Sequence, residues 1–197
     1  MAKDIQLITH GHPYVEIGGV KWATMNVGAT KPDEVGQYFA WGDTKGYYNV
    51  KANSFTEKTY KFYGLNGMAL KYNDKDKLKS LKPEDDPVHA NWRGDWRLPT
   101  DKEISSLIAA CAHVYRAENV MVLVSKDGQE LLFPLSGHCV EGMLLRHTGS
   151  CYLWSSSLDD YDGRLAKFFQ LYSYHEPEIG FCRRVFGFNV RGVLARD

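Results

Sequence analysis

The chain has 197 residues, a length that suits one domain, and its 24 basic residues balance its 24 acidic residues. A formal net charge of zero gives no sign of the overall basic character that many nucleic-acid-binding proteins have. No segment is long and apolar enough to span a membrane, so we expect neither a nucleic-acid partner nor membrane insertion. The first ten residues lack the apolar core of a secretion signal. Three locations stay open: the cytosol, release as part of a particle, or export by a signal that was removed.

Residues 12–30 predict a β-hairpin. Apolar and polar residues alternate over 14–17, two glycines form a turn at 18–19, and residues 20–23 return along the first strand. A short apolar strand is expected next, at residues 37–41.

Residues 44–82 are polar, rich in Lys and Tyr, and without clear periodicity. We interpret them as a long surface insertion in the single domain, of a length that is usually functional or mobile. Its run of Lys and Asp is more typical of a solvated face than of a partner site.

Three acidic residues follow at 84–86. They could ligate Ca²⁺ through oxygen, cap a short helix, or pair with Arg93 and Arg97. No EF-hand spacing of ligands accompanies them, which favours the two structural roles.

Thr100 and Glu103 match a capping box, in which the first residue caps a helix and the second reaches back to it. The helix is expected to run through about Tyr115. Its apolar face would contain Ile104, Leu107, Ile108, Cys111 and Val114, so that Cys111 is a small buried hydrophobe. Residues 119–125 and 130–134 then predict two strands around an Asp-Gly turn.

The four cysteines include no Cys-x-x-Cys pair, which argues against a zinc site. Four cysteines allow three disulfide pairings, but without an export signal free thiols are expected. We expect no metal and no cofactor. The cysteines are Cys111, Cys139, Cys151 and Cys182.

The C-terminal segment 152–193 has an unusual composition. Its ends, at 154–157 and 188–191, have the pattern of buried framework, with a Trp followed by three Ser at one end and alternating polarity at the other. Between them, many Tyr and Phe mix with Asp and Arg, which suits a binding surface made of rigid aromatics and charges. The aromatics could equally be ordinary strand residues, and composition alone favours that interpretation because core aromatics are so common.

Seven ordered segments, most of them containing Trp, resemble a known family: residues 19–29, 36–43, 84–86, 94–103, 132–137, 153–157 and 187–191. In this order they are similar to the Fibrobacter succinogenes major paralogous domain of gut Bacteroidetes and their phages. The similarity covers residues 14–193. It implies an α+β, C-type lectin-like fold of the formylglycine-generating-enzyme-like branch, with short antiparallel strands and one or two helices. Core anchors would be Trp22, Trp41, Trp96 and Trp154.

The resemblance implies a non-enzymatic binding protein. Some relatives look like exported adhesins or pilus-associated domains, and others resemble the variable proteins of diversity-generating retroelements. In the latter, adenine-directed mutagenesis changes a ligand-binding face near the C-terminus, here about residues 154–193. Asn codons ending in a pyrimidine can change to every residue type in the following set, which we predict to bind ligand: Asp160, Tyr161, Asp162, Arg164, Phe168, Tyr172, Tyr174, His175, Ile179, Phe181, Val185 and Phe186. The same codons cannot give Lys167, Gln170, Glu176 or Glu178, which would be fixed by the template.

Two departures from the family favour the retroelement or phage context. The chain lacks the signal or lipoprotein Cys of exported members, and Gly192-Val193 replaces an expected Pro-Val. A phage virion or a cell surface is therefore the expected location. The ligand would be a protein or a glycan, such as a bacterial cell-surface receptor, and an oligomer is compatible because avidity offsets weak single-site affinity.

Other functions have weaker support in the sequence. An unvarying adhesin of the same family is the main alternative. An oxygenase like the formylglycine-generating enzymes would use Cys151 and Cys182 with copper, but the surrounding motif is missing. A hydrolase using Ser155, His175 and Asp159 lacks a nucleophile elbow. The segment 176–178 resembles a Ca²⁺-dependent lectin motif whose partner motif is absent.

Overall fold

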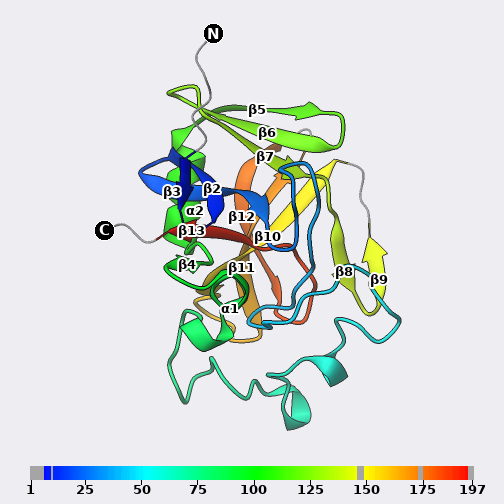
Figure 1. Ribbon diagram of the computed structural model, residues 1–197. Coiled ribbons are helices and arrows are strands. Elements are labelled where there is room, and N and C mark those ends of the chain that lie inside the picture. The colour runs from blue at the N-terminus through cyan, green and yellow to red at the C-terminus, as the bar shows by residue number, and fades with distance from the viewer. Residues whose placement is uncertain (1–6, 10, 146–148, 173–174, 195–197) are drawn as a thin grey trace.

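The computed structural model describes residues 7–9, 11–145, 149–172 and 175–194. This part of the chain consists mostly of antiparallel strands with two α-helices, an α+β structure (Figure 1). Neither helix is long and apolar enough to cross a membrane. The strands are β1 (Leu7–Thr9), β2 (His12–Ile17), β3 (Val20–Asn26), β4 (Trp96–Arg97), β5 (Cys111–Ala117), β6 (Val120–Ser125), β7 (Glu130–Pro134), β8 (His138–Val140), β9 (Met143–Leu145), β10 (Ser150–Leu158), β11 (Leu165–Tyr172), β12 (His175–Arg183) and β13 (Arg191–Leu194). The α-helices are α1 (Pro87–Trp92) and α2 (Asp101–Ala110), and 3-10 helices span Glu57–Thr59, Leu65–Gly67 and Pro83–Asp85.

Both ends of the described chain meet in a five-stranded sheet of order β1-β2-β3-β13-β4. In β13, Val193 pairs with Trp22 of β3 on one side and with Arg97 of β4 on the other. The hairpin predicted at residues 12–30 is confirmed as β2 and β3. Its turn requires glycine, because Gly18 and Gly19 have φ of 62° and 71°.

The C-terminal segment forms a second sheet of order β10-β11-β12, on which α2 packs. The register of β10 against β11 shifts between Trp154 and Leu158, so β10 is irregular where it approaches the next loop. A third sheet has the order β5-β6-β7, and β8 pairs with β9. The strands predicted at 119–125 and 130–134 are confirmed as β6 and β7.

The capping box at the start of α2 is confirmed. The Thr100 hydroxyl accepts the amide of Glu103 at 3.2 Å, and the Glu103 carboxylate accepts the amide of Thr100 at 2.8 Å. Arg97 adds two bonds to the same carboxylate, at 2.7 and 2.8 Å. Burial raises the pKa of Glu103, but these bonds outweigh that effect and lower it. On the apolar face, Ile104 and Leu107 are buried.

The predicted end of this helix was wrong. The helix stops at Ala110 rather than near Tyr115, and Cys111 begins strand β5. Pairing of β5 with β6 overrides the helical spacing of the apolar residues, so Cys111 and Val114 lie on a strand.

All four tryptophans expected in the core are at most 2% exposed: Trp22, Trp41, Trp96 and Trp154. Trp154 stacks on Phe188 with ring centroids 4.3 Å apart, and its Nε1 donates to the Phe39 carbonyl at 2.8 Å. Both framework ends of the C-terminal segment are buried, as the sequence indicated, and the structure shows in addition that they pack on each other.

Residues 37–41 do not form a regular strand. They make single bridges, Tyr38 with Tyr47 and Phe39 with Phe188. The amide of Trp41 donates to the carbonyl of Arg184 at 2.8 Å. This stretch therefore runs between the insertion and the C-terminal segment without joining a sheet.

The insertion at 44–82 is more deeply buried than the predicted surface segment. Four of its aromatic side chains are buried in the main core cluster: Phe55, Tyr60, Phe62 and Tyr72. The Tyr60 hydroxyl donates to the Trp41 carbonyl at 2.7 Å, which fixes the insertion to the framework. The absence of a regular period concealed these anchors, because each packs from an irregular backbone.

The structural interpretation of the acidic run is confirmed, with different partners for one residue. Asp86 caps α1 by accepting the amides of Val88 and His89 at 2.8 and 3.1 Å. Asp85 bonds Lys61 and Lys71 of the insertion, rather than the arginines at 93 and 97.

Candidate functional site

The loop between β10 and β11, residues 159–164, is held in a tight conformation by one buried carboxylate. Asp159 is 8% exposed, and its Oδ1 accepts the amides of Tyr161 and Asp162 at 3.0 and 2.9 Å. Its own amide donates to the Leu165 carbonyl at 3.1 Å, which closes the base of the loop. A carboxylate that satisfies two backbone amides in this way is typical of a rigid turn. At its apex, the side chain of Tyr161 is 98% exposed.

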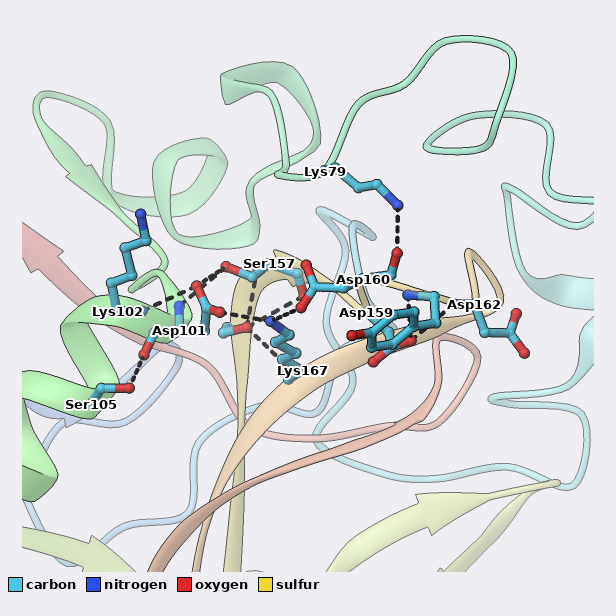
Figure 2. Close-up of polar contacts among 11 residues, drawn as sticks. Lys79, Asp101, Lys102, Ser105, Ser157, Asp159, Asp160, Asp162 and Lys167 are labelled. Carbon is cyan, nitrogen blue, oxygen red and sulfur yellow. Dashed lines mark hydrogen bonds and ion pairs between the residues drawn. The ribbon is translucent and has the colours of Figure 1, made fainter.

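A second set of contacts ties this loop to α2 (Figure 2). The Nζ of Lys167 lies 2.7 Å from Asp160 and 2.8 Å from Asp101, at the first turn of α2. Burial lowers the pKa of Lys167, but the bonds to the two carboxylates outweigh it and raise the pKa. Lys79 of the insertion donates to the Asp160 carbonyl at 3.2 Å. Strand β11 and the insertion therefore both bond Asp160, and Lys167 links it to α2.

Strand β12 adds an exposed aromatic beside this network. Phe181 lies directly opposite Lys167 in the β11–β12 register, and opposite residues point to the same face of a sheet. Phe181 is 63% exposed. Asp160 and Tyr161 of the rigid loop and Phe181 of the edge strand β12 are all exposed to solvent.

The other side of the loop borders a cavity of about 430 Å³, which we call the arginine pocket. It is lined by insertion residues such as Glu57, Tyr63 and Ala69, and by Asp162, Arg164 and Arg183. Arg183 and Glu57, which both line the pocket, form an ion pair. Arg164 binds Asp162 through two nitrogens, at 2.7 and 3.0 Å, which lowers the pKa of Asp162.

Arg184 joins the loop to the insertion at the base of the arginine pocket. It is 2% exposed and donates to the carbonyls of Gly163, Lys71 and Tyr72 at 2.9 to 3.2 Å, and to the Tyr60 hydroxyl at 3.0 Å. Its guanidinium carbon lies 4.7 Å from the ring centroid of Trp41. These contacts satisfy a buried cation with carbonyl oxygens and aromatic faces.

A second cavity of about 420 Å³ lies beyond Tyr60 and Val185, which line both pockets; we call it the lysine pocket, after Lys45 and Lys51. Asp43 also lines it. Burial raises the pKa of Asp43 to about 6, an effect that Lys61 opposes.

The structure separates the predicted ligand-binding residues by exposure. Asp160, Tyr161, Arg164, His175 and Phe181 are exposed, and Asp162, Tyr172, Ile179 and Phe186 are half-buried. Phe168 and Val185 belong to the core cluster and are each 7% exposed, and Val185 also lines both pockets. Tyr174 lies outside the described residues.

The half-buried residues take part in internal packing. The hydroxyl of Tyr172 lies 3.1 Å from that of Tyr152, and Phe186 stacks on His138. Ile179 packs against the core cluster that contains Phe169. The structural interpretation of the aromatics therefore applies to this inner group, and the exposed residues concentrate in the loop and along β12.

Sequence reasoning missed the insertion as a wall of the site, and with it Tyr60 and Phe62. One signal was present: Tyr60, Phe62 and Tyr72 are large apolar rings within an otherwise polar stretch. Rings of that size are normally buried, even where no strand or helix period is visible.

The residues weighed for hydrolysis do not come together. The Ser155 hydroxyl donates to the Lys167 carbonyl at 2.7 Å, and Asp159 is occupied by loop amides. His175 pairs with Tyr172, five residues along β11 from Lys167 and thus about 16 Å away by strand rise.

All four cysteines are free, and burial raises the pKa of both Cys139 and Cys151 to about 12. Burial also raises the pKa of Cys182. Within the described ranges, no group of three or more His, Cys, Asp or Glu side chains is arranged to hold a metal.

Comparison of the chain with protein-family models, with curated protein sequences and with solved structures gave no match.

Proposed function

We propose that the protein is a non-enzymatic ligand-binding protein, with a sequence-variable surface on a C-type lectin-like scaffold. The ligand contacts lie on the loop 159–164 and the exposed side of β12. The inner residues of the same segment, such as Phe168 and Trp154, form the framework that carries them.

One observation supports this proposal above the others: a nearly fully exposed tyrosine stands on a loop with a fixed backbone. Tyr161 is 98% exposed, while the preceding Asp159 is buried and bonds the backbone on both sides of the loop apex. An exposed aromatic adds nothing to folding, but it supplies contact area at little entropic cost when its backbone is already ordered. Such a loop tolerates many side chains at its apex, provided that the buried carboxylate remains.

The resemblance to retroelement variable proteins gives this proposal a test that needs no known ligand. The 3′ end of the gene would be sequenced deeply in the population from which it came. Substitutions should concentrate at the exposed codons 160, 161, 164 and 181. Codons 154, 159 and 167 should be constant, because their side chains hold the framework and the loop.

If codons 159–186 vary no more than the codons of α2, the proposal of a diversified surface is wrong. The same scaffold would then be better explained as an unvarying adhesin. Variation spread evenly over buried and exposed codons would also count against the proposal, because random change at Phe168 or Trp154 disrupts the core.

A further inference from the structure

The insertion carries a compact apolar projection, residues 63–70, which we call the insertion tip. Its backbone is closed by a bridge between Tyr63 and Ala69, and the amide of Gly64 donates to the Met68 carbonyl at 2.9 Å. The amide of Leu70 donates to the carbonyl of Phe62, whose ring is buried in the core. The tip is therefore an ordered element that is attached to the framework at its base.

The apolar side chains of this tip face solvent. Leu65 is 88% exposed, Leu70 66%, Met68 65% and Tyr63 37%. Single exposed apolar residues are common on protein surfaces, but several within one short ordered element mark an interaction site. Each of these four residues remains more than one-third exposed in the described part of the chain.

The tip is continuous with the arginine pocket. Tyr63, Gly67 and Ala69 belong to the tip and line that pocket, which the loop residues Asp162 and Arg164 also line. The pocket volume of about 430 Å³ lies within the usual range for ligand sites. Its deep part is aromatic and aliphatic, formed by Tyr60, Phe62 and Val185, which are each at most 8% exposed. An apolar side chain from a partner would be desolvated there against rings, as anchor residues are in protein interfaces.

Charge indicates what surrounds such an anchor. Residues 44–82 contain nine lysines and three acidic residues. Glu57 is paired with Arg183, and Lys61 and Lys71 are paired with Asp85, so seven lysines remain against Asp74 and Asp76. The insertion is thus a basic segment in a chain of zero net charge, and it complements an acidic partner surface.

We propose that the insertion tip and the arginine pocket form one docking surface for a protein ligand. This ligand inserts an aromatic or aliphatic side chain into the pocket and surrounds it with acidic residues. The inference rests on the proposed function and deepens it, because it assigns the ligand to proteins rather than glycans. It also makes the insertion a fixed half of the interface, opposite the variable half.

The test uses a library of random, disulfide-closed peptides displayed on filamentous phage and selected on the immobilised full chain. Enriched peptides should share an aromatic or aliphatic residue flanked by Asp or Glu. Synthetic copies should lose at least tenfold in affinity towards the variant Leu65→Ser/Met68→Ser/Leu70→Ser, as measured by fluorescence polarisation. Binding should also weaken as salt rises from 50 to 500 mM, since exposed charge pairs are screened.

A matched control variant is Tyr115→Ser/Met143→Ser, which removes two apolar side chains that are 42% and 55% exposed on β5 and β9. It should bind the peptides as the unchanged protein does, and circular dichroism should show both variants folded. The proposal is overturned if no peptide is enriched, if the enriched peptides lack an apolar anchor, or if the tip variant binds them normally. Loss of binding only in Tyr161→Ala/Phe181→Ala would likewise reject the tip while leaving the proposed function in place.

Discussion

Lys167 of β11 bonds Asp160 of the adjacent loop, with 2.7 Å between Nζ and Oδ2. Adenine-directed mutagenesis of an Asn codon ending in a pyrimidine can give Asp, as at position 160, but it cannot give Lys, as at position 167. Under the proposed function, a constant residue therefore orients a position that varies. The same Nζ also binds Asp101 at 2.8 Å. Helix α2 therefore helps to fix the position of Lys167, and through it that of Asp160.

Replacement of Lys167 should destabilise the protein more than loss of an exposed ion pair. The Lys167 side chain is 18% exposed and that of Asp101 27%, so Lys167→Met leaves a partly buried carboxylate without its cation. We expect a loss of about 1 kcal/mol in the free energy of unfolding, measured with urea. The matched control is Arg164→Met, which breaks the pair of a 76% exposed side chain and should change stability by less than about 0.5 kcal/mol. Equal losses in the two variants would show that Lys167 has no anchoring role.

Asp159 should control the order of the loop. Asp159→Ala removes the acceptor for the amides of Tyr161 and Asp162 and should cost about 1–2 kcal/mol, as loss of a helix cap does. Exchange of these two amides with deuterium should become faster, as measured by NMR. Asp159→Asn keeps an acceptor oxygen and should retain most of the protection. If the alanine variant exchanges at the original rate, another contact orders the loop.

Some of this architecture can be read from the sequence, because certain local patterns determine their own structure. The glycine pair at 18–19 permits one kind of tight turn. The capping box of Thr100 and Glu103 provides acceptors for backbone amides at the start of α2, whatever that helix packs against. By contrast, the end of α2 depends on the partner strand β6. Local spacing favoured a longer helix, and pairing across the third sheet terminated it at Ala110.

The site was harder to predict, because exposure on a strand depends on what lies above it. Ile179 and Phe181 point to the same face of β12, since they are two residues apart. Ile179 nevertheless packs on the core, while Phe181 is 63% exposed. Alternation gives the face of the sheet, but the limited extent of the elements packed on it determines which residues on that face are covered.

Asp43 should make stability depend on pH in a specific direction. Its pKa in the folded protein, about 6, exceeds the ordinary 3.8, so the folded state binds the proton more tightly than the unfolded state. This contribution is fully present below about pH 4 and is lost as the pH rises through 6. The variant Asp43→Asn has no carboxyl group to ionise at this position, so its stability does not fall as the pH rises through 6. Compared with the unchanged protein, the variant should therefore gain about 1–2 kcal/mol between pH 4 and pH 7.5, with allowance for partial solvation. Urea unfolding of both proteins at the two pH values measures this gain, and a difference that does not change with pH would exclude a raised pKa.

Arg184 should determine whether the insertion stays attached to the framework. Arg184→Met removes the donor for the carbonyls of Lys71, Tyr72 and Gly163 and leaves buried acceptors without partners. We expect a cost of about 3 kcal/mol or more, because each unsatisfied buried group costs roughly 1–3 kcal/mol. Limited digestion with trypsin provides a local measurement, since the insertion contains lysines at which the enzyme cleaves. Cleavage at Lys58, Lys61 and Lys71 should accelerate in this variant before the rest of the chain is cut. The neighbouring Arg183→Met removes an exposed side chain that pairs with Glu57, and it should digest as the unchanged protein does. If both variants resist trypsin equally, the buried aromatic rings alone hold the insertion in place.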